Sequence, residues 1–505
     1  MHARMPTRQR PVPFHVRARA AFRPATHLAA LAWLLASCGT PGVRGVPGTA
    51  PAPNALWTPP RDATAPRAAP ALPPNLPADL AERIAQLTLA DVIDIALRNN
   101  SATSAAWADA RAAAATYGAA KGQYYPTIDL AGSATSVKTV GAGGQTAVKQ
   151  DYYRGTLNLS WLLLDFGGRS GSIGEAREGL LAADWTHNAT LQAVVLTVER
   201  SYLGYVGTRA LLAAQRTSLD GAQTSLAAAE QRHNVGLATI ADVLQARTAV
   251  SQARLAFQAT EGQLQTTRGA LALSMGLPAN VPYDIAPPAD TLPPLGITDS
   301  VETLIDRAVQ ERPDLAAQRA DARAARARVS VARAAALPSL SVGGSTGQTS
   351  FAGNPTLSNN YAATLTLSIP LFSGGSQIYD VRAASAAAEA AEQRTVGFEQ
   401  QVVFEVFNAF YALRTATEQV RTSADLLASA ALAEQATLGR YRAGAGSLLD
   451  LLAAQASLAG ARAQSIQSRV SWYAALAQLA HDTGILGLDG GTSLHIKADT
   501  TDTNH

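Results

Sequence analysis

Most of this chain is a duplication, because two halves of the sequence resemble each other over nearly their whole length. Ala96–Ile128 aligns without gaps to Ala308–Leu340, and a proline stands at the same place in both segments, Pro126 and Pro338. Three further pairs of landmarks follow in the same order: Gly167–Gly168 with Gly374–Gly375, Arg232–Gly236 with Arg440–Gly444, and Asp242 with Asp450. Repetition on this scale indicates duplication of a whole structural unit rather than a solenoid of short repeats. The alignment predicts three regions: a first repeat over 81–278, a linker over 279–300 and a second repeat over 301–484.

Within each repeat the spacing of apolar residues predicts a helix, two strands and two longer helices. Leu89–Tyr124 carries apolar residues and alanine at helical spacing and stops before Pro126, a helix breaker. Aliphatic residues then alternate with small polar ones in four segments, two per repeat: 128–135, 157–161, 339–342 and 364–371. Such alternation, aliphatic on one face and polar on the other, is typical of the strands of transmembrane barrels.

Two segments without proline, Gly171–Val235 and Ser376–Ala443, predict unusually long helices. At about 1.5 Å per residue, each would extend roughly 100 Å. Each is followed by a glycine, and the chain then reverses into a second helix: Thr239–Met275 in the first repeat and Ser447–Thr483 in the second. Hairpins of this length need partners to cover their apolar faces, and their many alanines allow helices to approach closely.

The four predicted strands raise a difficulty, because four strands cannot close into a barrel. An open sheet in lipid leaves the backbone groups of its edges unpaired, at a cost of several kcal/mol per group, and known membrane barrels begin at about eight strands. Three chains would supply twelve strands, so the strand count predicts a trimer. Aromatic residues bracket the strands as interfacial girdles do: Tyr124, Tyr125, Tyr152, Tyr153, Trp161, Phe166, Tyr361 and Phe372.

The first 37 residues have the composition of an export signal. Arginines, with no acidic residue, precede the short apolar run Leu28–Ala36, as in a secretory signal peptide. The one cysteine, Cys38, follows Leu35–Ser37, which resembles the lipobox of bacterial lipoproteins. That resemblance implies a signal over 1–37, a lipidated Cys38 and, with Gly39 next, sorting to the outer membrane; an ordinary export signal with an incidental cysteine is the alternative. A proline-rich linker over 38–80 follows, and residues 485–505 read as a flexible tail.

Composition and motifs exclude several classes of function. No run approaches the roughly 18–20 apolar residues of a membrane-spanning helix, which argues against a polytopic inner-membrane protein. Without its arginine-rich leader the chain is slightly acidic, so a nucleic-acid partner is not indicated. Neither a P-loop nor an HExxH motif occurs, and no GxGxxG follows a strand. We therefore predict that the protein is not an enzyme and has no cofactor or metal site.

Taken together, these features resemble the TolC-type outer-membrane efflux channels. The resemblance is carried by the duplicated order of elements, by Arg312–Asp314 at the start of the second copy, and by the two turn sequences Val235–Leu244 and Ala443–Leu452. The lipobox points to the lipoprotein branch that serves multidrug pumps. The implied fold is a mixed α+β membrane protein with an internal duplication. Its twelve-stranded outer-membrane β-barrel, four strands from each chain of a homotrimer, is continued by a long α-helical coiled-coil barrel in the periplasm.

The same resemblance implies the function and the partners. The channel would passively conduct drugs or other small molecules that it receives from an inner-membrane efflux transporter through a periplasmic adaptor protein. It would lie in the outer membrane, anchored to outer-membrane lipid through Cys38, and extend into the periplasm. Two alternatives stay open: the channel of a type I protein-secretion system, and a lipid-anchored periplasmic coiled-coil scaffold without a pore.

The two turn sequences contain the candidate site residues. Thr239–Asp242 and Ser447–Asp450 have the spacing of a capping box, in which an acid near the helix N-terminus stabilises the start of a helix. In the family, polar links between such tips hold the periplasmic mouth closed. The resemblance therefore assigns Asp242 and Tyr441 to this gate, with Gly446 in place of the family's arginine. It also assigns Asp450 to a ring of carboxylates at the constriction, while Ala453 stands where a second ring would be.

Docking of the adaptor is the remaining assignment. The resemblance places it on the tips, at Gly236, Leu237, Gly444 and Gly446. Glycines that only permit a left-handed backbone at the ends of helices are the alternative explanation.

Overall fold

The computed structural model describes residues 52–57, 86–140, 147–286 and 300–485 of the chain. The predicted signal peptide, Cys38 and most of the predicted linkers and tail lie outside these residues. Among the helices described, none is both long enough and apolar enough to cross a membrane.

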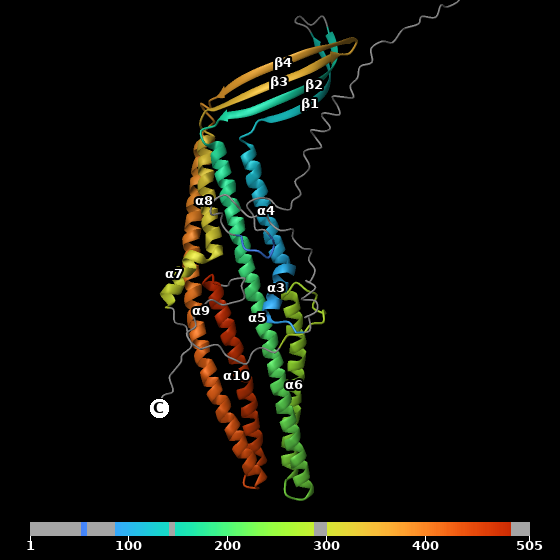
Figure 1. Cartoon of the computed structure of the whole chain (residues 1–505), viewed down its shortest axis with the longest axis vertical. Helices are drawn as coiled ribbons and strands as arrows, with labels where there is room; N and C mark the ends of the chain where they lie inside the picture. The colour runs from blue at the N-terminus through green and yellow to red at the C-terminus, as the bar shows by residue number, and fades with distance from the viewer. Residues whose placement is uncertain (1–51, 58–85, 141–146, 287–299, 486–505) are drawn as a thin grey trace, which may run out of the picture. The chain divides into compact units, whose positions relative to one another are not determined.

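The described residues form eight helices and four strands, labelled in Figure 1. In the first repeat these are α3 (Leu89–Asn99), α4 (Ser101–Gly122), β1 (Thr127–Val140), β2 (Ala147–Leu164), α5 (Gly168–Asn234) and α6 (Ile240–Ser274). In the second they are α7 (Val301–Glu311), α8 (Pro313–Ala334), β3 (Ser339–Phe351), β4 (Asn354–Ser368), α9 (Ser376–Arg442) and α10 (Leu448–Asp482). Matching helices have equal lengths, 67 residues for α5 and α9 and 35 for α6 and α10.

The single helix expected over Leu89–Tyr124 is instead two helices, α3 and α4, which meet at Asn100. Asn100 has an extended backbone, and its side chain accepts a hydrogen bond from the Ala102 amide (2.8 Å), so it caps α4. The second repeat has the same break at Arg312, between α7 and α8. There the cause is Pro313, which disfavours a helical backbone at the preceding residue and fits the first position of a helix.

The four strands form one antiparallel sheet in the order β1-β2-β3-β4. The register places aliphatic residues opposite one another across strand pairs, as with Ile128 and Leu159, and Val342 and Leu365. Small polar residues lie on the other face, where the Asn158 side chain donates to the Asp129 carboxylate (2.8 Å). Of the described strands, β1 and β4 each have one edge without a partner strand.

The aliphatic face of this sheet is exposed. Leu365 is 66% exposed, Leu367 61% and Leu130 69%, although leucine is normally among the most buried residue types. Several of the bracketing aromatic residues are exposed as well: Tyr124, Tyr125, Tyr153, Trp161, Phe166, Tyr361 and Phe372. An apolar face of this size on a protein surface indicates a partner or a membrane.

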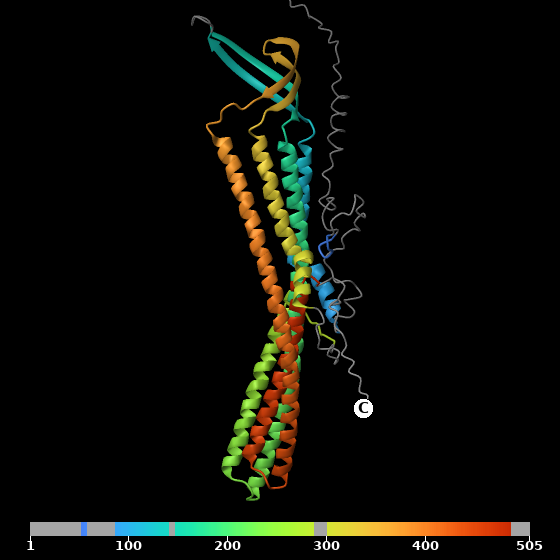
Figure 2. The same ribbon diagram turned by 90° about the vertical axis from the view of Figure 1, so that its left-hand side faces the viewer.

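The helices run side by side, as both views show (Figures 1 and 2). α5 contacts α4, α6, α8 and α10, and α9 contacts α7, α8 and α10. The largest apolar core lies at the middle of α5 and α9, where the short helices α3 and α7 and the ends of α6 and α10 meet them. Its fully buried members include Leu191, Leu271, Leu304, Leu315 and Leu479.

Candidate functional site

The two long hairpins reverse in turns of the same construction. After α5, the amide of Gly236 donates to the His233 carbonyl oxygen (2.9 Å) and the amide of Leu237 to that of Arg232 (2.8 Å). After α9, Gly444 and Ala445 make the equivalent bonds to Tyr441 and Arg440. This is the Schellman ending of a helix, which needs a left-handed residue, and Gly236 and Gly444 have φ of 74° and 72°. We call these two turns, Val235–Thr239 and Ala443–Ser447, the tips.

Both tips lead directly into capping boxes. Thr239 donates from its amide and its hydroxyl to the Asp242 carboxylate (2.8 Å each), and the Asp242 amide donates back to the Thr239 hydroxyl oxygen. Ser447 and Asp450 form the same pair at α10. The hydrogen bonds from Thr239, side chain first and backbone second, lower the pKa of Asp242 below its usual range. Its carboxylate therefore stays charged near the positive end of α6.

Tyr441 lies at the centre of a small core that joins the two hairpins near their tips. Its ring, 7% exposed, packs in a cluster with residues from all three of the other tip helices: Ala229, Ala246, Leu448 and Leu451. The Arg232 guanidinium carbon lies 4.6 Å from the centroid of this ring. Arg232 also donates from Nη1 to the Tyr441 carbonyl oxygen (3.1 Å). These contacts connect the end of α5 to the end of α9.

The structure thus places Tyr441 in contact with the other hairpin. Its hydrogen-bonded partner there is Arg232, whereas the resemblance had assigned Asp242 to the same gate. The recorded hydrogen bonds of the Asp242 carboxylate go to Thr239 in its own capping box. Gly446 is tightly enclosed, since a Cβ at this position would lie 3.2 Å from the Tyr441 nitrogen. A side chain here would require its neighbours to move by a few tenths of an ångström, a strain that glycine avoids.

Exposed apolar side chains surround the first tip. Val235 is 66% exposed, Leu237 73% and Ile240 58%. Leu244 on α6 and Leu449 in the first turn of α10 are exposed in the same way. In a Schellman turn the residue at the place of Leu237 often packs its side chain back onto the last turn of the helix, but Leu237 remains largely exposed.

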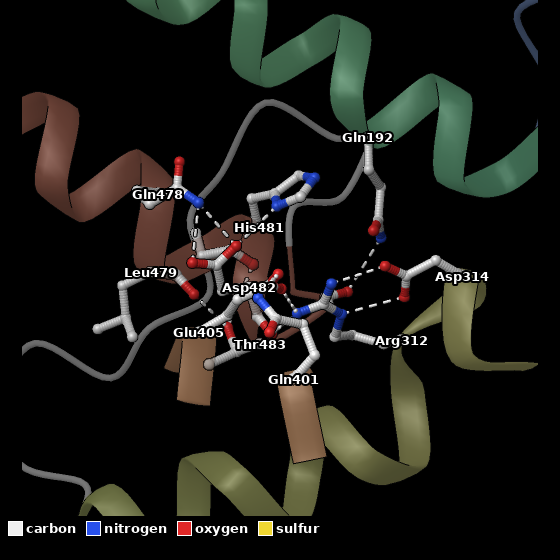
Figure 3. Close-up of polar contacts among 12 residues, drawn as sticks. Gln192, Arg312, Asp314, Gln401, Glu405, Gln478, Leu479, His481, Asp482 and Thr483 are labelled. Atoms are coloured by element: carbon white, nitrogen blue, oxygen red, sulfur yellow. Dashed lines mark hydrogen bonds and ion pairs between the residues drawn. The ribbon is translucent and has the colours of Figure 1, made fainter. Parts of the chain in front are cut away.

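A second polar constellation lies in the middle of the helices (Figure 3). The buried Arg312 donates from Nη2 and Nε to Asp314 (2.6 and 3.0 Å) and from Nη1 to Glu405 (2.7 Å). Burial alone lowers the pKa of Arg312, but these two carboxylates more than offset it, so the pKa is raised. Next to it, Asp482 accepts hydrogen bonds from Gln478 (2.7 and 2.8 Å) and contacts His481 at 2.9 Å. This network fixes the junction of α7 and α8 against α9 and α10.

The short segment 52–57 also binds the middle of α5. The Asn188 side chain accepts a hydrogen bond from the Trp57 amide (2.8 Å) and donates to the Trp57 carbonyl oxygen (2.7 Å), as a strand partner would. His187 contacts the Ala55 carbonyl oxygen through Nε2 (2.9 Å). The Trp57 ring is buried and packs edge-on against Trp185, with centroids 5.5 Å apart.

Asp184 lies one helical turn before Asn188 and supports a prediction about how the stability of the protein depends on pH. It is fully buried, and neither carboxylate oxygen has a hydrogen-bond partner in the described part of the chain. Burial raises its pKa to about 8. Between about pH 4 and pH 8 the folded chain therefore keeps a proton on Asp184 that the unfolded chain has released. The free energy of unfolding should fall as pH rises through this window, by up to roughly 1.4 kcal/mol per pH unit.

We expect Asp184→Asn to remove this pH dependence. The melting temperature of the variant, followed by helical circular dichroism in detergent, should exceed that of wild type by more at pH 8 than at pH 5. Asp220→Asn, at an exposed position of the same helix, is the matched control and should shift both values equally. If the melting temperatures of wild type and Asp184→Asn change with pH by the same amount, Asp184 does not take up a proton on folding.

Sequence reasoning did not assign Arg232, Asn188 or the carboxylate partners of Arg312 to any role. Arg232 and Arg312 both belong to motifs that the sequence makes visible, but Tyr441 lies 209 residues from Arg232 and Glu405 lies 93 residues from Arg312. The one usable signal was the tripeptide Arg312–Asp314, in which an arginine precedes a proline and an acid.

Comparison with known proteins places the chain in a family. The model of the outer membrane efflux protein family matches residues 92–277 and 304–484, one segment in each repeat. Protein CyaE of Bordetella pertussis is 31% identical over 393 residues, which cover 76% of this chain and 81% of CyaE. The toluene efflux pump outer membrane protein TtgC of Pseudomonas putida is 27% identical over 413 residues, 77% of this chain and 82% of TtgC.

Solved structures agree with these sequence matches. A membrane protein from Pseudomonas aeruginosa superimposes with a TM-score of 0.71 at 27% identity, and the match covers 78% of this chain and 93% of that one. The family model alone accounts for most of both repeats. With its duplicated helices, its four-stranded sheet and its paired tips, the chain belongs to the outer membrane efflux protein family.

Proposed function

We propose that three copies of this chain form a passive outer-membrane channel, the exit duct of a tripartite efflux system. The observation that carries the proposal is the four-stranded sheet, with an exposed aliphatic face and two edges without a partner strand. Spanning strands in lipid must close into a barrel. The four strands of one chain are too few to close, whereas three such sheets supply twelve. The exposed aromatic residues around the strands suit the two membrane interfaces.

The helices and tips suit the periplasmic part of such a duct. The long hairpins would surround a tunnel, and the exposed apolar residues Val235, Leu237 and Ile240 would receive a periplasmic adaptor at the first tip, together with the glycines Gly236, Gly444 and Gly446. Tyr441 would help to hold the mouth closed, and Asp242 would keep the start of the neighbouring helix in place through its capping box. Asp450 would form a ring of three carboxylates whose charge favours cations modestly.

Substrate and energy would come from other proteins. A passive channel needs no catalytic group, so an inner-membrane transporter would supply the driving force and the adaptor would connect it to the tips. Lipidation of Cys38 would add an outer-membrane anchor to the barrel. TtgC is named as part of a toluene efflux pump, and small hydrophobic or amphipathic compounds are the substrate class that we propose here.

Two measurements test this proposal together. Native mass spectrometry of the full-length protein in detergent should give a trimer, and a strain that lacks the gene should become susceptible to a panel of antimicrobials and solvents. A monomer without outer-membrane association would favour the periplasmic scaffold. A trimer whose loss leaves drug susceptibility unchanged but blocks export of a protein would favour protein secretion.

A further inference from the structure

We propose that Arg232 is the latch that holds the two hairpins of one chain together at the mouth, and that it acts on the ring face and backbone of Tyr441 rather than on its hydroxyl. This inference rests on the proposed channel function. It assigns a gating role to a residue in the last turn of α5, in place of a link through the Asp242 carboxylate.

Arg232 makes two different contacts with the same residue. Its Nη1 donates to the Tyr441 carbonyl oxygen at 3.1 Å, and its guanidinium carbon lies 4.6 Å from the centroid of the Tyr441 ring. A cation over an aromatic face is attracted by the ring quadrupole, more strongly where the contact is partly desolvated. The Tyr441 ring is buried, so the contact has that character.

Arg232 and Tyr441 each lie in the last turn of a long helix, where the chain begins to reverse into the second helix of its hairpin. The carbonyl oxygen of Arg232 accepts the amide of Leu237, so Arg232 is also the anchor of the first Schellman turn. Tyr441 likewise accepts the amide of Gly444 at the second turn. The latch therefore joins the two residues from which the two tips start, and moving one hairpin outward must separate them.

Other polar groups at the tips act within their own hairpins. Asp242 is bound by Thr239 at the start of α6, and Asp450 by Ser447 at the start of α10. Arg247 and Glu230, 3.3 Å apart, connect α6 to α5 inside the first hairpin. None of these pairs resists separation of the two hairpins. Farther from the tips, the Ser225 hydroxyl on α5 donates to the Gln455 side chain on α10 (3.2 Å), so Arg232 is, among the described residues, the polar link between the hairpins that lies nearest the tips.

This geometry predicts a pattern that a hydroxyl-based gate would not give. Arg232→Ala and Tyr441→Leu each remove the cation–ring contact and should raise the ratio of open to closed channels, on the order of tenfold. Tyr441→Phe removes only the hydroxyl and keeps the ring and the carbonyl oxygen, so it should behave like wild type. Because arginine stays charged at all accessible pH values, the effect should be the same at pH 5 and pH 8.

The test is single-channel recording of purified full-length variants in planar lipid bilayers. We expect Arg232→Ala to open at least as far as Tyr441→Leu, since it also removes the hydrogen bond to the Tyr441 carbonyl oxygen. The double variant should open no further than Arg232→Ala alone, because both substitutions act on the same pair of residues. Arg247→Gln is the matched control, because it removes an arginine from the same tip region without affecting the two hairpins' contact. A melting curve for each variant separates opening from loss of folding.

Failure of the latch and failure of the channel give different results. If wild type conducts and Arg232→Ala conducts identically, the latch is wrong while the channel stands. If Tyr441→Phe opens the channel as far as Tyr441→Leu, the hydroxyl holds the mouth and the assignment to Arg232 is overturned. If wild type itself gives no channels, the proposed function fails.

Discussion

Replacing Arg312 with alanine should destabilise the folded chain by about 1.5–3 kcal/mol, because it removes charge-assisted hydrogen bonds and leaves two half-buried carboxylates without their partner. Arg312 is 5% exposed and binds Asp314 through two nitrogens and Glu405 through a third. These bonds fix the break between α7 and α8 onto α9 (Figure 3). We expect a strongly lowered melting temperature and loss of the assembled protein from outer-membrane extracts.

Two further variants make this prediction specific. Arg312→Lys keeps the charge but cannot bind Asp314 with a planar pair of donors, so it should recover only part of the stability. Arg326→Ala removes an arginine that joins α8 to Glu392 on α9 but is 62% exposed. An exposed ion pair contributes at most about 1 kcal/mol. If Arg312→Ala and Arg326→Ala have the same melting temperature, the network around Arg312 does not stabilise the junction of α7 and α8.

The double variant Leu365→Arg with Leu367→Arg should prevent assembly in the outer membrane. Both leucines lie on the exposed aliphatic face of β4. An arginine on the lipid-facing side of a barrel costs about 2–4 kcal/mol at the midplane, so the two together exceed what a marginally stable fold tolerates. The measurement is the amount of heat-modifiable protein in the outer-membrane fraction at equal expression.

Thr366→Arg is the matched control for this pair. Thr366 lies between the two leucines and points to the opposite, polar face of the sheet, where it is paired with Ser341. A single arginine there should be tolerated and alter only conduction. Normal assembly of the Leu365/Leu367 variant would mean that this face does not meet lipid.

Most of the fold could be predicted from the sequence, because the two repeats show the same pattern of elements twice. Prolines and glycines end the helices at nearly the expected residues, since α5 ends at Asn234 before Gly236 and α9 at Arg442 before Gly444. The strand segments also emerge as one antiparallel sheet. These features depend on local chemistry, because a breaker, a capping box or a two-residue alternation can be read without knowledge of the partner.

The contacts that the sequence did not reveal are those between distant segments. Asn100 continues a helical pattern, and its role as a cap becomes visible only from its extended backbone. The hydrogen bonds between Asn188 and Trp57 join residues 131 positions apart, and the contact between Arg232 and Tyr441 joins residues 209 positions apart. Neither pairing leaves a periodic signal, because an isolated arginine or asparagine on a long helix is also what a solvated surface contains.

The central claim, that this chain forms a channel, is tested most directly by the conductance of the purified wild-type protein. Full-length protein, isolated from outer membranes as an intact oligomer, should produce discrete current steps when added to a planar lipid bilayer, with a modest preference for cations. The Leu365/Leu367 arginine variant, refolded and added in the same amount, should produce none. A wild-type protein that is properly folded but gives no current steps at any voltage would contradict the account.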